Sequence, residues 1–190
     1  QSGQNSTGDS SICIGSFAGQ NKNGNDNLYI GNSVAKNSNG NVNIAIGSFA
    51  GYDNTGNNNV FMGSQSGFVN RTNNNMFIGT LSGRNNTTGT NNIFMGTDSG
   101  YTSTTSNNNR FMGYQSGFYN NSNFNMFFGY KAGYNNNTGN NNTFIGIYSG
   151  YNNTTGSGNI MIGRYSGFSN NAQNDNILIG EYSGYNSNGV

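Results

Sequence analysis

The chain has 190 residues, of which 44 are Asn and 31 are Gly, and it contains no Pro, His or Trp. Charged residues make up only 7% of it and the formal net charge is +1, so no basic surface for nucleic acid is expected. No segment approaches the ~20 consecutive apolar residues of a membrane-spanning helix, and six scattered acidic residues with a single Cys form no catalytic constellation. We therefore expect no enzyme, no cofactor and no metal site.

One short phrase recurs eleven times along the chain. It consists of Asn, three apolar residues, Gly, two variable residues, Ser or Ala, Gly and usually an aromatic residue, and it is clearest at positions 43–51. The Gly after the apolar triplet recurs every 16 or 17 residues from Gly15 to Gly180. Such a strict period indicates a folded repeat array. We divide the chain into a polar N-terminal lead-in arm at 1–10, a repeat domain at 11–185 and a C-terminal end at 186–190.

Each apolar triplet is too short for a helix, and its flanking Asn and Gly are typical of a short strand between turns. No apolar period of 3.6 residues is present, so essentially no helix is predicted. A second short strand is predicted at the Ser/Ala–Gly–aromatic segment of each repeat. The fold class is therefore all-β, a parallel β-solenoid of about eleven coils of 16–17 residues. The predicted triplet strands are 12–14, 28–30, 44–46, 60–62, 76–78, 93–95, 110–112, 126–128, 143–145, 160–162 and 177–179.

Alternation along a strand places the first and third triplet residues on one face and the middle residue on the other. Because the third residue is never polar, the first and third are expected inside the coil. The middle residue would then form an outward apolar stripe too large for a soluble monomer. Either identical chains cover this stripe, or the coil is wide enough to enclose both faces; we favour an oligomer interface. Its predicted residues are the six middle phenylalanines, Phe61, Phe77, Phe94, Phe111, Phe127 and Phe144.

Two ladders of like side chains are expected along the stack. Aromatic residues after the second Gly should stack coil on coil, either as a stabilising ladder or as a platform for sugars. Its members are Tyr52, Phe68, Tyr101, Phe118, Tyr134, Tyr151, Phe168 and Tyr185. The Asn before each triplet should form a ladder of hydrogen-bonded amides. Its members are Asn27, Asn43, Asn59, Asn75, Asn92, Asn109, Asn125, Asn142, Asn159 and Asn176.

The pattern Asn-x-Ser/Thr, the acceptor for N-glycosylation, occurs repeatedly in the segments that return from one strand to the next. These segments are expected to be accessible, so they supply the candidate glycosylation sites. The candidates are Asn70, Asn85, Asn86, Asn120, Asn136, Asn152 and Asn153.

The motif Asn43-Ile44-Ala45-Ile46-Gly47, followed by Ala50, resembles the head repeats of trimeric autotransporter adhesins (YadA-like heads) and related phage and bacterial fibre repeats. The resemblance spans nearly all of residues 11–185. It implies a left-handed parallel β-roll, three chains packed side by side, extracellular display and adhesion. In that family the middle apolar residue faces the trimer axis.

The functional hypothesis is a structural subunit of an extracellular fibre or filament, which assembles through coil stacking and apolar side faces. Its partners would be identical chains, as a trimer, an end-to-end filament or both. The alternative is an adhesin or tail-fibre head that binds glycans or a host surface. Neither hypothesis involves nucleic acid or a membrane span.

Overall fold

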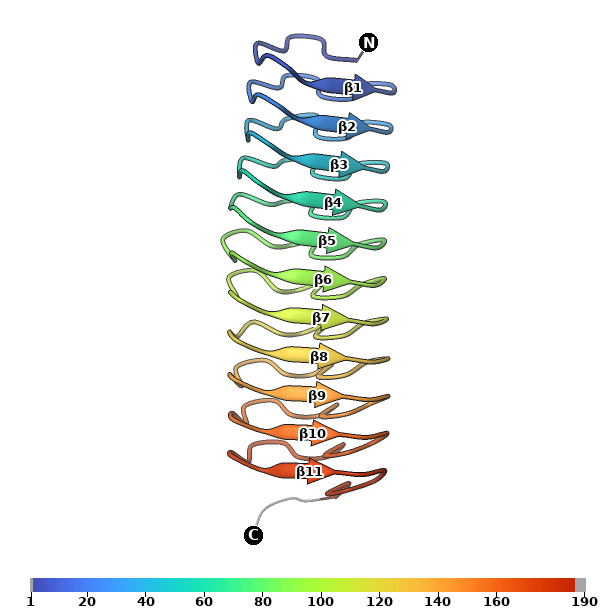
Figure 1. The fold of residues 1–190 in the computed structure, drawn as a ribbon, viewed down its shortest axis with the longest axis vertical. Coiled ribbons are helices and arrows are strands. Elements are labelled where there is room, and N and C mark those ends of the chain that lie inside the picture. The colour runs from blue at the N-terminus through green and yellow to red at the C-terminus, as the bar shows by residue number, and fades with distance from the viewer. Residues whose placement is uncertain (1, 187–190) are drawn as a thin grey trace.

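The protein is a straight stack of coils, described by a computed structural model over residues 2–186 (Figure 1). In this part of the chain each coil contributes one strand of three residues, and eleven strands pair in chain order into one parallel sheet. The predicted β-solenoid is confirmed. The strands are β1 (Ile12–Ile14), β2 (Leu28–Ile30), β3 (Ile44–Ile46), β4 (Val60–Met62), β5 (Met76–Ile78), β6 (Ile93–Met95), β7 (Arg110–Met112), β8 (Met126–Phe128), β9 (Thr143–Ile145), β10 (Ile160–Ile162) and β11 (Ile177–Ile179).

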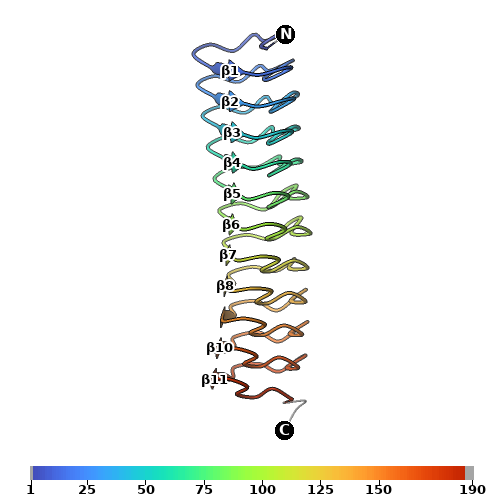
Figure 2. The same cartoon turned by 90° about the vertical axis from the view of Figure 1, so that its right-hand side faces the viewer.

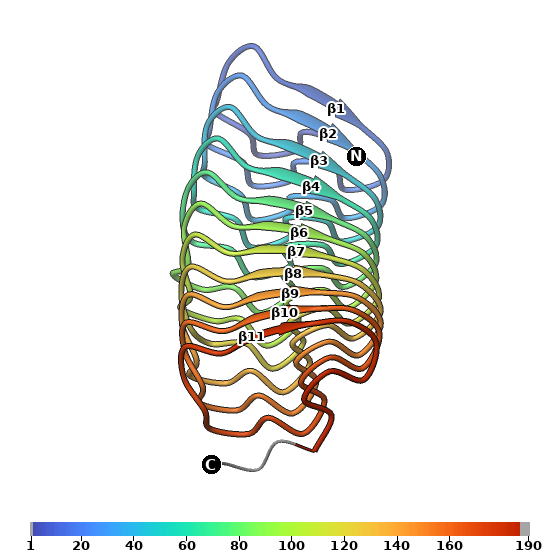
Figure 3. The ribbon, with the colours of Figure 1, turned by 60° about the horizontal axis from the view of Figure 1, so that its bottom comes forward.

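The strand bounds coincide with the predicted triplets, and equivalent residues of successive coils pair with one another. Phe94, for example, lies opposite Phe77 on one side and Phe111 on the other. The prediction of a second strand in each coil is wrong. The Ser/Ala–Gly–aromatic segment forms turns instead, so the sheet occupies one wall and irregular backbone closes the coil behind it (Figures 2 and 3).

Left-handed backbone geometry makes the corners of each coil. In the coil of β6, positive φ angles occur at Asn91 (58°), Gly96 (132°), Asp98 (57°) and Gly100 (59°). Residues other than Gly, Asn and Asp adopt this region at a cost of roughly 1–2 kcal/mol. The first and last of these positions in each repeat are therefore rich in Asn and Gly, and the chain turns sharply at fixed points.

The middle residue of each strand points into the coil, which reverses the predicted assignment of faces. The six phenylalanines predicted to form an oligomer interface, Phe61, Phe77, Phe94, Phe111, Phe127 and Phe144, are 0% exposed within a single chain. From Phe77 to Phe144 successive rings stack with centroids 4.8–4.9 Å apart. The prediction of an interface at these residues is wrong, because one chain alone buries them completely.

The opposite wall explains why only one large side chain per coil fits inside. A Cβ atom added at Gly67 would lie 2.4 Å from the Phe61 ring, and one at Gly117 would lie 2.4 Å from the Phe111 ring. Ser116, beside Gly117, is also fully buried, and its Oγ donates a hydrogen bond to the Phe127 carbonyl (3.1 Å). The two flanking residues of each strand consequently point outward.

The lead-in arm continues the stack rather than standing away from it. Gly3 N–H donates to the Ala18 carbonyl (2.8 Å), and Asn21 N–H donates to the Gln4 carbonyl (2.9 Å). Below the arm, Cys13 occupies the middle position of β1, half-buried against the core. Of the predicted C-terminal end at 186–190, residues 187–190 lie outside the described part of the chain.

The reversed assignment of faces predicts a sharp contrast between two adjacent residues. Phe111→Ala should lower the free energy of unfolding by about 3–5 kcal/mol, because it empties the interior between two stacked rings. Met112→Ala should cost less than ~1 kcal/mol, since Met112 is already 39% exposed. Urea denaturation followed by circular dichroism measures both. Equal losses would contradict the assignment.

A second prediction concerns Val42, a β-branched residue with a φ of 55°. The equivalent position one coil later holds Asn58, with a φ of 57°. Because Val42 is 55% exposed, little packing is lost on replacement. Val42→Asn should therefore raise the free energy of unfolding by about 1 kcal/mol. The reciprocal variant Asn58→Val should lower it by a similar amount, and unchanged melting temperatures in both would contradict the argument.

Candidate functional site

The outer face of the β1–β11 sheet is the largest functional candidate. It carries the first and third residues of every strand, and apart from Arg110 and Thr143 all of them are Ile, Leu, Val, Met or Phe. Because the strands pair in register, these side chains form two parallel columns along the rod. We call this surface the outer sheet face.

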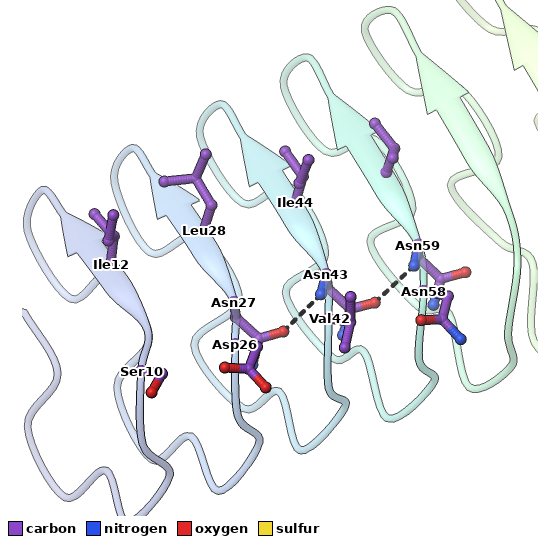
Figure 4. Close-up of a pocket in the computed structure, with 11 residues that line it drawn as sticks. Ser10, Ile12, Asp26, Asn27, Leu28, Val42, Asn43, Ile44, Asn58 and Asn59 are labelled. Atoms are coloured by element: carbon purple, nitrogen blue, oxygen red, sulfur yellow. Dashed lines mark hydrogen bonds between the residues drawn. The ribbon is translucent and has the colours of Figure 1, made fainter.

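The outer sheet face is at least partly exposed along all eleven strands. Its side chains reach exposures of 57% at Ile12, 39% at Met62 and Met112, and 70% at Ile177. An apolar surface that runs along all eleven strands is more extensive than the scattered single hydrophobic residues usual on a soluble monomer. At the edge of this face, over β1–β4, lies a shallow hollow of about 530 Å³ in which Ile12, Leu28 and Ile44 project to the same side (Figure 4).

The predicted aromatic ladder is present beside the turns. Tyr52 stacks on Phe68 with centroids 5.0 Å apart, and the second run extends from Tyr101 to Tyr185 at 5.1–5.2 Å. Between the two runs the coil carries Arg84, whose guanidinium lies 5.1 Å from the Phe68 ring and 6.0 Å from the Tyr101 ring. Cation–π contacts thus bridge the gap. Within each run the rings cover one another, which favours a stabilising ladder over a platform for sugars.

The predicted ladder of Asn residues before each strand is also present, but its hydrogen-bond partners differ from those expected. Asn27 Oδ1 accepts a hydrogen bond from the backbone N–H of Asn43 (2.8 Å), and Asn43 Oδ1 accepts one from Asn59 (2.9 Å) (Figure 4). Asn43 Nδ2 donates to the Gly56 carbonyl (3.0 Å). The buried amides therefore bind mainly backbone groups, and direct amide–amide bonds, such as Asn176 to Asn159 (2.9 Å), are secondary.

A second buried Asn ladder was missed from the sequence. It lies three residues after the second Gly of each repeat, a constant spacing that could have identified it. Asn70 Nδ2 donates to Asn54 Oδ1 (2.9 Å), and Asn136 Nδ2 donates to Asn120 Oδ1 (2.6 Å). Ser103 interrupts the column, and the buried Oδ1 of Asn86 accepts no hydrogen bond from any described residue. The members are Asn54, Asn70, Asn86, Asn120, Asn136, Asn153 and Asn170.

This second ladder corrects most of the glycosylation predictions. Asn70, Asn86, Asn120, Asn136 and Asn153 are 0% exposed, so no glycan can be attached to them in the folded chain. They were expected to be accessible because their segments are polar, but the side chains satisfy the backbone inside the coil. Asn85 and Asn152 are half-buried and remain candidates.

At the N-terminal end the same column holds polar groups of a different kind. Lys22 is only 2% exposed, and its ammonium donates to the Gly24 carbonyl (2.6 Å) and to Ser11 Oγ (2.8 Å). One coil later, the Tyr29 hydroxyl is 3.0 Å from Ser38 Oγ, and burial raises the pKa of Tyr29 to about 12. Burial also raises the pKa of the Cys13 thiol. A raised pKa keeps Cys13 protonated and therefore a poor nucleophile.

Within the described residues, no group of three or more His, Cys, Asp or Glu side chains could hold a metal ion. The same part of the chain contains no helix long and apolar enough to cross a bilayer.

The buried ladder predicts that neighbouring asparagines differ greatly in importance. Asn136 donates to Asn120 and to the Gly139 carbonyl (2.8 Å) and accepts from Asn153 (2.7 Å). Asn136→Ala should therefore lower the free energy of unfolding by about 3 kcal/mol, because its buried partners lose their hydrogen bonds. Asn137→Ala, at an exposed position, is the matched control and should cost less than ~0.5 kcal/mol. Comparable destabilisation in the two variants would refute a structural role for this ladder.

Known proteins offer no functional assignment. No family model, curated protein or solved structure matches the chain. Function has to be inferred from the geometry of the rod itself.

Proposed function

We propose that the chain is a structural subunit of an extracellular fibre or filament, in which identical rods pack side by side through the outer sheet face. The single observation that carries this proposal is the apolar surface along one whole side of the rod. Ten of its side chains, including Ile14, Met76 and Ile160, are between 37% and 70% exposed. A surface of this size and composition is typical of an interface between subunits.

The shape of the face supports a second copy of the same chain as its partner. The sheet is straight along the rod (Figure 1), and Ile, Leu, Val and Met residues recur on its outer face in successive coils. An identical rod offers the same repeat, so its side chains can interdigitate along the full length. Because coils of equal height also stack end to end, one repeat serves both lateral and axial growth.

The interior supports a mechanical role. Stacked phenylalanines, two buried Asn ladders and the aromatic ladder connect every coil to the next in the described part of the chain. Such a rod resists bending because deformation breaks several columns at once. The resemblance to adhesin heads and fibre repeats is consistent with extracellular display, which belongs to this proposal.

The proposal predicts that charge on the outer sheet face separates the rods. The double variant Met112→Glu/Ile145→Glu should convert assemblies into single chains at micromolar concentration, because burying two carboxylates against an apolar face is costly. Both side chains already face solvent in the single chain, at 39% and 37% exposure, so the coil itself should remain folded. Light scattering measures the mass and circular dichroism checks the fold.

The matched control places the same charges elsewhere on the rod. Asn137→Glu/Thr138→Glu changes two exposed return-segment residues and should leave the mass of the assembly unchanged. If the unmodified chain is already a monomer at high micromolar concentration, or if Met112→Glu/Ile145→Glu keeps its assembled mass, lateral packing through this face is excluded.

A further inference from the structure

A polar groove runs along the rod on the return segments of its C-terminal half, away from the sheet. One hollow of about 490 Å³ spans four successive coils, those of β6 to β9, and a second of about 280 Å³ continues it. The two hollows share Thr154, so they form one channel parallel to the rod axis. The lining residues are Thr102, Thr104, Tyr119, Asn121, Asn135, Asn137, Asn152, Thr154, Ser169 and Asn171.

The groove is lined by amides, hydroxyls and one aromatic ring, without a charged side chain. In the N-terminal half, the equivalent positions of two successive coils hold Asp53 and Arg71, which form an ion pair at 3.1 Å. These two charged residues interrupt the row of neutral residues in the N-terminal half, whereas the row is unbroken from Thr102 to Asn171. A neutral, hydroxyl-rich ligand fits such a lining, whereas a phosphate, a cation or an acidic peptide finds no opposite charge.

Hydrogen bonds within the lining hold its side chains in place. Asn135 Nδ2 donates to Asn152 Oδ1 (2.8 Å), and Thr104 Oγ1 donates to Asn121 Oδ1 (3.1 Å). The Nδ2 groups of Asn121 and Asn152 donate no hydrogen bond to any described residue. Each amide therefore has its oxygen fixed by the neighbouring coil and keeps its donor available. Fixed polar groups reduce the entropy cost of binding.

Tyr119 differs from the tyrosines of the aromatic ladder. Its ring stands at 75° to Phe118 and 88° to Tyr134, so it is not sandwiched between parallel rings. It is 46% exposed and borders the groove. An exposed aromatic ring beside hydrogen-bonding groups is the combination that recognises a sugar, whose ring has an apolar face and hydroxyls at its rim.

We infer that this groove binds a neutral, extended polysaccharide, with successive sugars aligned to successive coils. Equivalent lining residues repeat once per coil, at about 4.8 Å. A sugar in an extended β-linked chain advances by nearly the same distance and is flipped over relative to its neighbour, so the same hydroxyls of every second sugar meet equivalent amides and hydroxyls. A chain with a helical backbone loses this match after one or two units. The groove lies apart from the outer sheet face and does not depend on assembly.

Titration calorimetry with neutral hexasaccharides tests this inference. Cellohexaose, mannohexaose and chitohexaose are extended β-linked chains, and maltohexaose is a helical chain with the same sugar units as cellohexaose. At least one extended hexasaccharide should bind with a Kd below about 1 mM, and maltohexaose should bind at least tenfold more weakly. Tyr119→Ala should weaken binding about tenfold. Tyr130→Ala, which removes an exposed tyrosine outside the groove, should leave the affinity unchanged.

The inference is overturned if none of the three extended hexasaccharides binds, if maltohexaose binds equally well, or if Tyr119→Ala and Tyr130→Ala have the same affinity. Repeating the titration on Met112→Glu/Ile145→Glu separates this inference from the proposed function. Binding that persists in single rods supports the groove whether or not the rods assemble.

Discussion

Register between coils is the constraint on which the whole rod depends. A coil this narrow cannot pair its own backbone groups across its interior, so each coil must bind the ones above and below it. Asn43, for example, donates its backbone N–H to Asn27 Oδ1 and offers its own Oδ1 to Asn59. A shift of one residue would break this contact, the strand pairing and the ring stack together. The same residue therefore recurs at the equivalent position of successive coils.

The same constraint decides where the large side chains go. Gly67 and Ser66 leave space on the inner wall for one ring, which Phe61 fills. All other bulky residues of the coil must lie outside, including both neighbours of Phe61 on its strand. The packing that stabilises the rod therefore also leaves apolar side chains along one side of it. Its interior and its exposed surface are two results of a single packing rule.

Much of the fold could be predicted from the sequence, because the spacing of Gly and of the apolar triplets is a direct signature of stacked coils. All eleven strand positions, the aromatic ladder and the Asn column before each strand came from that spacing. The direction of the middle side chain did not, since alternation separates two faces without saying which is inside. The small residues Gly67 and Ser66, which lie opposite Phe61, are the sequence feature that indicates which face is inside.

Buried residues such as Asn136 were taken for surface groups because polar composition alone does not reveal a hydrogen-bonded interior. The groove beside Tyr119 depends on ring orientation, which no sequence pattern encodes.

The small difference in length between coils has an evolutionary consequence. The additional residue of the longer coils lies between the second buried Asn ladder and the Asn that precedes the next strand, as in Asn86–Asn92 compared with Asn70–Asn75. The strands and both Asn ladders of successive coils stay aligned, because only the segment between the two ladders differs in length. A gene that gains or loses one whole coil by unequal recombination would therefore still encode a continuous rod. The length of such a protein can change in single-coil steps, and each new copy can acquire its own surface residues.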